Sequence, residues 1–508
     1  MVDARRAGED PAAAAHPPPA PDPRRWKALA VCLVAGFMTL LDVSIVNVAL
    51  PAMEVGIGAT PSDLQWVVSG YALAFGLFLV PAGRTGDVVG RRTMFIAGVV
   101  TFGLASLLCG LAPNSAVLIV GRLLQGIGGG LLNPQVSGLI QELFHGRERG
   151  RAFGLFGATV AVSTAVGPIV GGLIIGLLGA EVGWRWIFFV NLPIVVGAVL
   201  LARRWLPEPH RRPHGERLDL DPVGVLVLGL GVAALLLPLV ESGRGGSALA
   251  FPWWLGLVGA GLVTGFILWE NAYTARGRSA LVDLKLFRVP GFSSGATVSA
   301  VYFAGFTGIF FVLTIYFQQG VGYSALLAGL VVTPYAAGSA LGSWFGGRLV
   351  HRFGRLLVTA GLALTLVGLV VVDVVLGSVQ GRGIGWAVAL PLLVAGLGSG
   401  FVISPNITLT LHEVPVRRAG TAAGLLQTGQ RMGTAAGIAL IGTVFFAVAT
   451  SSGQVAGATM ALRIAAAVIS VALIASAVDL RTRRREGRVA PASTDAAQPA
   501  PRHTSPEA

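Results

Sequence analysis

The chain has 508 residues, of which 54% are hydrophobic and only 12% are charged. Soluble domains carry about 25% charged residues, so this composition excludes an ordinary soluble protein and indicates many membrane spans. The formal net charge of +13 could suggest a nucleic-acid-binding protein, so the placement of the basic residues has to be examined.

Fourteen apolar stretches are long enough to cross a hydrocarbon core of about 30 Å, which takes about 20 helical residues. The stretches are continuously apolar and do not alternate, which predicts helices and not a β-barrel. In chain order we place them at residues 28–50, 64–82, 93–112, 115–141, 152–179, 186–202, 222–240, 251–270, 289–318, 324–347, 356–376, 383–411, 419–447 and 459–479.

The basic residues lie mostly on one side of the predicted membrane. With the N-terminus inside, all but six of the 37 Lys and Arg residues fall in inner loops and tails, the exceptions being Arg185, Arg244, Arg382 and Arg463 outside, and Arg122 and Arg431 within spans. This asymmetry follows the positive-inside rule. We therefore expect both termini in the cytoplasm and no nucleic-acid partner. The near absence of lysine suggests a GC-rich bacterial genome, hence the bacterial inner (cell) membrane.

Two long interruptions divide the spans into six, a linking pair and six more. We expect a disordered cytoplasmic tail at 1–26, an N-terminal half at 27–205, a linker with two extra spans at 206–288, a C-terminal half at 289–480 and a basic disordered tail at 481–508. A pseudo-repeat supports this division, because residues 83–92 and 347–355 share glycine and arginine positions. Two related six-helix halves are typical of secondary transporters, whose substrate site lies between the halves.

Asp42 lies inside the first span and Arg122 inside the fourth. An acid at the bilayer centre costs roughly 2.5–3.5 kcal/mol on insertion scales, so we interpret Asp42 as a proton- or cation-coupling residue. The alternative is a carboxylate that only hydrogen-bonds a neighbouring helix. At 1.5 Å per residue both side chains lie roughly 12–13 Å below the outer boundary, so we expect them to pair. Arg122 favours the charged aspartate and burial the neutral one, a balance that suits proton exchange, although Arg122 could instead be a fixed counter-ion.

Several short motifs, in order, resemble those of one transporter family. Residues 83–92 resemble motif A of the major facilitator superfamily, with Thr85 where a leucine is usual. The surroundings of Asp42, residues 118–126 and residues 167–172, the last followed by 184–193, resemble motifs of the fourteen-helix drug:proton antiporter family. The resemblance implies an all-α polytopic membrane protein with the major facilitator fold, in which two linking helices join two six-helix halves.

Motif A predicts an inner gate. Its glycines allow a tight turn between two spans, and Asp87 is placed to meet Arg91 or Arg92. The resemblance implies that Asp87 also docks at the N-terminus of the thirteenth span, near Gly420, where the helix dipole favours an anion by roughly 0.3–1 kcal/mol. Glu142 could join this cluster, and the alternative is an ordinary basic loop. The gating residues are Gly83, Asp87, Gly90, Arg91, Arg92 and Glu142.

The antiporter motif consists of Gly167, Pro168, Gly171 and Gly172. Glycines at this spacing usually mean close helix packing and nothing more. The resemblance implies a bendable, tightly packed helix at the interface between the halves. We interpret Trp184 and Trp186, which follow, as anchors at the outer membrane boundary.

Polar residues within the spans are candidates to line a substrate cavity. Arg431 lies near the midplane and cannot lose its proton, so it needs acceptors; hydrogen bonds that pack helices are the alternative. The other candidates are Asn47, Gln125, Asn133, Gln318, Asn406, Gln427 and Gln430. We expect no buried carboxylate in the C-terminal half, where Asp373 lies near an outer helix end. A dication would then lack a second counter-ion, so substrates should be neutral, anionic or at most monocationic.

No Walker loop, Gly-x-Ser-x-Gly or metal-ligand spacing occurs, so we expect no enzyme, no metal and no cofactor. Cys32 and Cys109 fall near opposite faces, too far apart for a disulfide. We predict proton-coupled efflux of hydrophobic or amphipathic small molecules, in drug or antibiotic resistance, by alternating access. The transporter would be a monomer driven by the proton gradient, with protons, substrate and membrane lipids as partners. The alternatives are a solute uptake symporter or facilitator on the same fold, or a membrane sensor that transports nothing.

Overall fold

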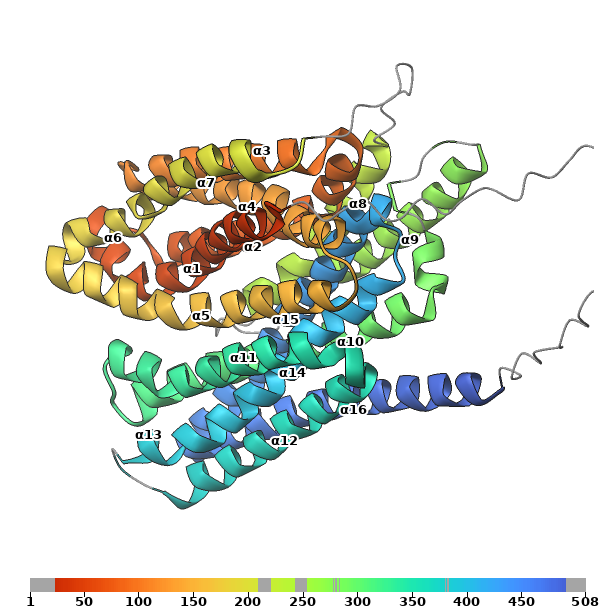
Figure 1. The fold of residues 1–508 in the computed structure, drawn as a ribbon. Coiled ribbons are helices and arrows are strands. Elements are labelled where there is room, and N and C mark those ends of the chain that lie inside the picture. Colours follow the sequence, from red (N-terminus) through yellow and green to blue (C-terminus); the bar gives the residue numbers. More distant parts are fainter. Residues whose placement is uncertain are drawn as a thin grey trace, which may run out of the picture.

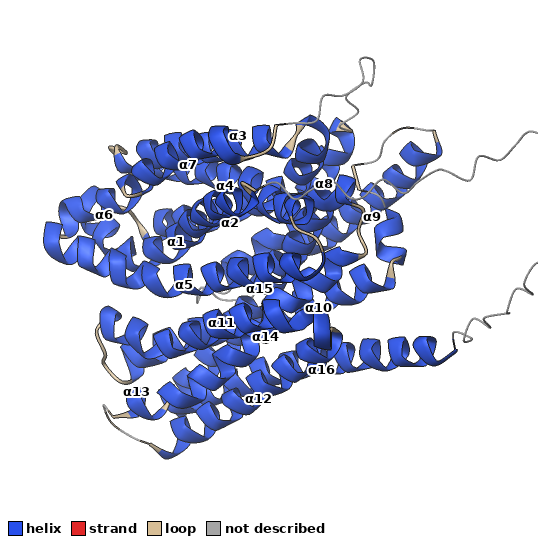
Figure 2. Cartoon of the chain, in the orientation of Figure 1, coloured by secondary structure: helices blue, strands red, loops and turns tan. Residues whose placement is uncertain are grey.

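The computed structural model describes residues 23–208, 221–242, 254–276, 278, 281–282, 284–379, 381 and 383–489. All regular structure within these residues is helical (Figure 2). Helices satisfy their backbone hydrogen bonds internally, which a chain in hydrocarbon requires because no water is present there. The predicted all-α class is confirmed.

The helices form two bundles, drawn as the upper and lower parts of Figure 1. The upper bundle is the N-terminal half, made of α1 (Arg25–Ile57), α2 (Pro61–Val89), α3 (Arg91–Gly110), α4 (Ser115–Leu143), α5 (Gly146–Leu178), α6 (Ala180–Phe189) and α7 (Asn191–Trp205). The last two helices share one span, Ala180–Trp205, which is interrupted at Val190.

The lower bundle is the C-terminal half. It contains α10 (Pro290–Ile315), the π-helical η2 (Tyr316–Gly320), α11 (Ala325–Phe353), α12 (Arg355–Ser378), α13 (Ile384–Ala387), α14 (Ala389–His412), α15 (Ala419–Ser452) and α16 (Gln454–Val489), with short 3₁₀ turns η1 (Leu284–Arg288) and η3 (Val416–Arg418).

The linking helices are α8 (Pro222–Ser242) and α9 (Trp254–Ala275), which lie beside the two bundles in Figure 1. α8 packs against α2, α15 and α9, so it contacts both halves. Among the described residues, thirteen helices are long and apolar enough to span a membrane, and α8 adds a shorter apolar stretch, Pro222–Leu235. This agrees with fourteen predicted spans.

Some predicted boundaries were wrong. Residues 83–89 continue α2 as helix, so a single residue, Gly90, joins α2 to α3 with φ 113°. In the second copy of the repeat, Gly354 joins α11 to α12 in the same way with φ 52°; glycine tolerates such angles because it has no Cβ. The basic tail expected from residue 481 starts as helix, because α16 continues to Val489. Residues 1–22, 209–220, 243–253 and 490–508 of the predicted tails and linker lie outside the described part of the chain.

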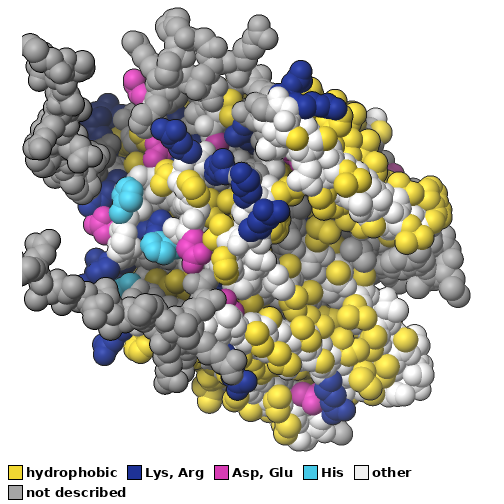
Figure 3. Space-filling view, turned by 90° about the vertical axis from the view of Figure 1, so that its right-hand side faces the viewer, with side chains coloured by type: hydrophobic (Ala, Val, Ile, Leu, Met, Phe, Trp, Pro, Cys, Tyr) yellow, Lys and Arg dark blue, Asp and Glu magenta, His cyan; other side chains and the backbone are white. Residues whose placement is uncertain are grey.

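The start of α1 and the end of α16 lie on the same side of the molecule, at the right of Figure 1. We call this the inner side. Lys and Arg side chains gather on this face (Figure 3), while large apolar side chains such as Leu104, Leu177 and Leu257 are exposed along the spans. A membrane therefore fits around the spans with the basic face on one side.

Candidate functional site

Asp42 and Arg122 form an ion pair in the interior of the N-terminal half. The Arg122 Nη1 to Asp42 Oδ2 distance is 2.5 Å, and the exposed fractions of the side chains are 1% and 0%. α1 carries the acid and α4 the base, as predicted from their equal depth below the outer helix ends. Each charge compensates the other where neither can be hydrated, so losing one partner would leave a costly buried charge.

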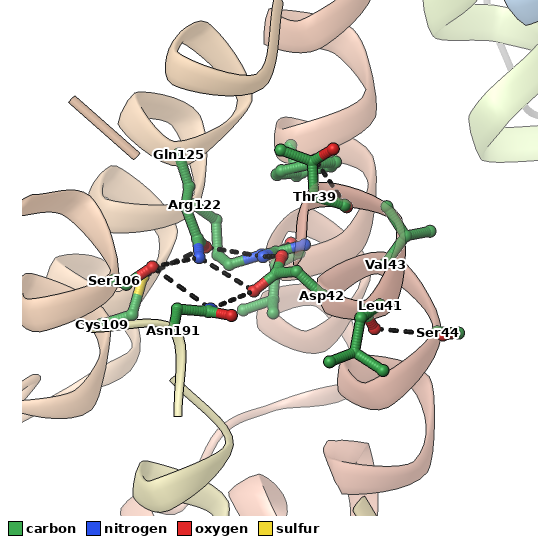
Figure 4. A network of polar contacts seen from close by, with 12 residues as sticks. Thr39, Leu41, Asp42, Val43, Ser44, Ser106, Cys109, Arg122, Gln125 and Asn191 are labelled. Atoms are coloured by element: carbon green, nitrogen blue, oxygen red, sulfur yellow. Dashed lines mark hydrogen bonds and ion pairs between the residues drawn. The ribbon is translucent and has the colours of Figure 1, made fainter. Parts of the chain in front are cut away.

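Three further polar residues complete this network (Figure 4). Gln125 and Asn191 donate hydrogen bonds to the second oxygen of Asp42, over 2.9 and 3.1 Å. Both amides also donate to Ser106 on α3, over 2.8 and 3.3 Å. The carboxylate therefore has donors at both oxygens, supplied by α4 and α7, and α3 orients those donors.

The guanidinium of Arg122 has partners besides Asp42. Its Nε donates to the backbone oxygen of Val67 over 2.9 Å, and Nη1 donates to Gln125 Oε1 over 2.7 Å. The ring of Tyr71 faces the guanidinium, with 4.3 Å between ring centroid and Cζ, a distance that suits a cation–π interaction. Arg122 is thus held by α2 and α4 independently of α1.

The sequence prediction missed Asn191, Ser106 and Tyr71 and placed Gln125 in the wrong site. Gln125 was expected in a substrate cavity, but it is buried in the ion-pair network. An available signal for Asn191 was its position as the polar residue of an apolar segment, within the motif at 184–193. Trp184 was interpreted as a membrane-boundary anchor, which was wrong: it is fully buried and packs against Gly56 of α1, whereas Trp186 is 50% exposed.

The inner ends of the two halves meet at Asp87. One carboxylate oxygen accepts hydrogen bonds from Gly420 N and Arg91 Nη2, both over 3.0 Å. The other accepts from the backbone and hydroxyl of Thr421, over 2.8 and 3.0 Å. Asp87 on α2 therefore occupies the positive N-terminus of α15, where free N–H groups and the helix dipole favour an anion.

Arg91 links this contact to two other segments. It forms an ion pair with Glu142 at the end of α4 over 2.9 Å and donates to the backbone oxygens of Gly138 and Val416. Arg92 points elsewhere, donating to the backbone oxygen of Arg203 over 2.6 Å. Of the two predicted partners of Asp87, the structure thus brings Arg91 to it.

Gly83 and Gly86 of motif A serve close packing and not a turn, because both lie within α2. A Cβ atom on Gly83 would lie 2.3 Å from the backbone oxygen of Gly420, and one on Gly86 would lie 2.0 Å from the Gln135 side chain. Bare backbone at Gly83 therefore lets α2 approach α15. Gly90 alone fulfils the predicted turn role.

The second repeat packs against the other half in a corresponding way. A Cβ on Gly347 of α11 would lie 2.3 Å from the backbone oxygen of Gly150, in the first turns of α5. Nearby, Gln141 donates to the backbone oxygen of Leu411 over 2.9 Å, and Arg149 contacts His412. The helix pairs α2–α15 and α5–α11, which join the two halves, are therefore both in close contact at their inner ends.

The antiporter motif lies where α5 packs on α1. A Cβ on Gly167 would lie 1.9 Å from Ser44 Oγ, and one on Gly171 would lie 2.9 Å from the Ile45 side chain. Pro168 faces Gly329 of α11, in the other half. A Cβ on Gly172, in contrast, would meet no atom within 4 Å. Of the four motif residues, three therefore lie at helix contacts, on α1 or on α11.

The proposed cavity residues fall into two groups. Near the contact of α4 and α15, Gln427 approaches the backbone oxygen of Asn133 at 3.5 Å, Gln430 donates to Ser299 over 2.8 Å, and the guanidinium of Arg431 lies 4.5 Å from the ring centroid of Phe75. The remaining predicted residues, Asn47, Gln318 and Asn406, lie in other surroundings.

Asn406 does not line a space between the halves. It is buried inside the C-terminal half, accepting from Arg355 over 2.7 Å and donating to the backbone of Gly295 over 2.8 Å. Asn47 is exposed and hydrogen-bonds its own helix, and Gln318 is exposed in η2 at the outer end of α10.

The expectation of a C-terminal half without a buried carboxylate was also wrong. Asp479, in α16, has a side chain that is 10% exposed and lies 3.1 Å from Arg355 Nε. This pair compensates its charge internally, so Asp479 does not supply a counter-ion to a substrate. Asp373 is 17% exposed and pairs over 3.1 Å with Arg463, which is exposed.

Neither cysteine is in a disulfide: Cys32 and Cys109 are both free and buried. Within the described residues, no group of three His, Cys, Asp or Glu side chains is placed to hold a metal ion. The groups that the described residues do bring together are a buried, ion-paired carboxylate and contacts between the inner ends of the two halves.

Two helical bundles, a buried ion pair within one of them and a charged contact between their inner ends define a polytopic membrane transporter. The chain belongs to the Major Facilitator Superfamily, which it matches over residues 32–438.

Two curated relatives cover most of the chain. It is 38% identical to the "Probable actinorhodin transporter" of Streptomyces coelicolor, over 86% of this chain and 75% of that protein. It is 34% identical to the "Puromycin resistance protein pur8" of Streptomyces alboniger, over 91% of this chain and 93% of that protein. Among solved structures, the proton:xylose symporter XylE superposes with a TM-score of 0.64 at 15% identity, over 89% of this chain and 94% of that one, a likeness of fold. The family resemblance predicted from the motifs is confirmed.

Proposed function

We propose that this protein exports hydrophobic or amphipathic small molecules, antibiotics among them, in exchange for protons. The observation that carries the proposal is the Asp42–Arg122 pair, a titratable acid buried in a membrane span whose counter-ion has other partners. The names of the two relatives, a probable actinorhodin transporter and a puromycin resistance protein, support export as the direction.

Protonation of Asp42 would release α1 from α4. The neutral acid no longer attracts Arg122, whose guanidinium keeps Val67, Gln125 and the Tyr71 ring as partners. Arg122 would then have no counter-ion, which is costly, and these hydrogen bonds and the cation–π contact would reduce that cost. The same partners hold Arg122 in position for the return of the ionised form.

A contact path leads from Asp42 to the other half. Two residues along α1, Ser44 Oγ donates to the backbone oxygen of Ser163 on α5 over 3.2 Å, and it touches Gly167. On α5, Pro168 faces Gly329 of α11. A shift of α1 on protonation would therefore displace α5 at its contact with the C-terminal half, which is how proton uptake would bias alternating access.

The closed inner gate corresponds to a conformation that faces outward. In it, Asp42 would exchange protons with the outside, and a bound substrate would leave there. Opening the inner gate requires the hydrogen bonds of Asp87 to α15 to break, after which the proton would be lost inside and a new substrate would bind.

The position of Arg431 supports the prediction that substrates are neutral, anionic or at most monocationic. No acidic side chain within the described residues pairs with it, and its guanidinium rests on Phe75. A second positive charge on a substrate would meet this cation, while the buried acids Asp42 and Asp479 are already paired with Arg122 and Arg355.

The protein would work as a monomer in contact with lipid, in a bacterial inner membrane with both termini in the cytoplasm. The proton gradient would be its energy source, without a cofactor. A solute uptake symporter remains the second candidate, because the xylose symporter has the same fold; the names of the curated relatives favour export.

The test is the direction of proton movement. A panel of toxic compounds, applied to a pump-deficient host that expresses the chain, identifies a substrate. Purified protein is then placed in vesicles with a pH-sensitive dye in the lumen. We expect substrate and protons to move in opposite directions. Movement of both in the same direction would contradict antiport and favour the symporter.

A further inference from the structure

A second buried acid lies in the linking helices, apart from the Asp42–Arg122 ion pair and from the inner gate at Asp87. Glu270 is in the last turns of α9, and its exposed fraction is 0%. Oε1 accepts a hydrogen bond from the backbone N–H of Val282 over 3.1 Å. Within the described residues, Oε2 has no hydrogen-bond partner.

The surroundings of Glu270 are apolar. Phe266, one turn earlier on α9, and Val282 belong to a buried cluster with Leu281, with Leu228 and Val232 of α8, and with Val80 of α2. An ionised carboxylate there would have one oxygen without a hydrogen-bond partner among the described residues, which is costly. A neutral carboxylic acid avoids that cost, with its proton on Oε2.

The neighbouring acid is built differently. Asp221, just before α8, is also buried, but its oxygens accept from the backbone N–H of Gly224 over 3.1 Å and from Trp269 Nε1 over 3.1 and 3.0 Å. Both oxygens of Asp221 therefore have hydrogen-bond donors, unlike those of Glu270. Asp221 and Arg84 of α2 are charged groups that act on Glu270 with opposite signs.

Other charged groups lie on the elements packed nearby. η1, which contacts α9, carries Lys285 and Arg288, and α15 carries Arg431 one turn before Ala435 of the same apolar cluster. Among these elements α2 has a special position, because it carries Arg84 and, three residues later, Asp87 of the inner gate. A movement of α2 that breaks the Asp87 contacts also moves Arg84 relative to Glu270.

We propose that Glu270 is a second proton-binding site, separate from Asp42, which holds its proton while the inner gate is closed. Proton binding at Glu270 and closure of the inner gate are then linked. Binding of the proton favours closure, and closure favours binding of the proton. The linking helices α8 and α9 would thereby report inner-side pH to α2.

The test uses purified protein without substrate, so it does not depend on what the protein exports. Infrared spectroscopy distinguishes a neutral carboxylic acid from a carboxylate, and the pH is varied from mildly acidic to mildly alkaline. We expect one neutral-acid band to be lost in Glu270→Gln and to be displaced, but retained, in Glu270→Asp. Asp373→Asn is the matched control, because that acid is paired with Arg463 outside the linking helices and its loss should leave the band unchanged.

The gate linkage is tested with the same band in Asp87→Asn. Because this change favours the open gate, the band should disappear at lower pH than in the wild type. Conversely, Glu270→Gln, which is permanently neutral, should lower labelling of single cysteines placed in the cavity from the inner side. An unchanged neutral-acid spectrum in Glu270→Gln would overturn the proton site. A lost band with no shift in Asp87→Asn would overturn its link to the gate.

Discussion

Asp87 and Thr421 bind each other through two hydrogen bonds to one carboxylate oxygen, one from the backbone and one from the hydroxyl. The two residues belong to different halves and are separated by more than three hundred positions in the chain. Their contact therefore exists only while the inner ends of α2 and α15 are together.

We expect Asp87→Asn to weaken the inner gate. The amide keeps the size but loses the charge that matches the N-terminus of α15 and Arg91, and hydrogen bonds to charged groups contribute about 1.5–3 kcal/mol. A loss of about 2 kcal/mol would shift the ratio of closed to open gates by roughly thirtyfold. Cysteine labelling of the cavity from each side measures this ratio. An unchanged ratio would mean that Asp87 does not hold the gate.

We expect Asp42→Asn to abolish proton-driven export while the protein still reaches the membrane. An amide of the same size can hydrogen-bond Gln125 or Arg122 but cannot take up and release a proton. Substrate-induced proton release in vesicles measures coupling, and substrate binding to purified protein is the control for folding. Coupling at the wild-type level would remove Asp42 from the mechanism.

We expect Asn191→Leu to slow proton-driven export. Asn191 donates to the carboxylate of Asp42, so without it the buried acid loses its hydrogen bond from α7. The change also leaves Ser106 with fewer partners, at a cost in stability of about 1–3 kcal/mol. Substrate-induced proton release, compared with substrate binding by the same purified variant, separates the two effects, because a merely structural role would lower both together.

We expect the antiporter motif to tolerate alanine at Gly172 but not at Gly167. The added methyl group at Gly167 would collide with Ser44 and push α5 away from α1, whereas at Gly172 it would enter open space. Overpacking of this kind costs typically 1–3 kcal/mol. Export assays on the two single variants, with membrane levels matched, decide the point. An equal loss of export in Gly167→Ala and Gly172→Ala would show that the motif does not act through the contact of Gly167 with Ser44.

We expect monocationic dyes to be exported better than matched dicationic dyes. Arg431 is the reason, since it adds a positive charge where a second counter-ion would be needed. Arg431→Gln should narrow the difference between the two dyes, and resistance profiles of a sensitive host measure it. Strong export of the dications by the wild type would contradict this view of the substrate site.

The Asp42–Arg122 pair could be predicted because both residues are charged and lie at equal depth from recognisable helix ends. The Asn191 contact could not, because it depends on the break at Val190 between α6 and α7. A continuous apolar run does not reveal such a break, and the break sets the direction of the side chain that follows it.

Asn406 illustrates the opposite error. It is a polar residue within a span, and sequence alone does not distinguish a residue that faces a cavity from one that binds a buried partner. Its partner Arg355 was placed in a loop, one residue before the predicted span, but it begins α12 and is buried. An error of one residue at a helix end is thus enough to hide a buried network. Asp479 was overlooked at the last position of the predicted span 459–479, which α16 extends to Val489.

The two copies of the repeat contact the opposite half through different kinds of groups. At the α2–α15 contact the fourth residue after Gly83 is Asp87, whereas at the α5–α11 contact the fourth residue after Gly347 is His351, which is exposed. The first seam is therefore held by charge at its inner end, and the second by closely packed glycine backbone. Loss of the charge of Asp87 should therefore loosen the first seam and leave the second unchanged, so the inner side would open from one edge.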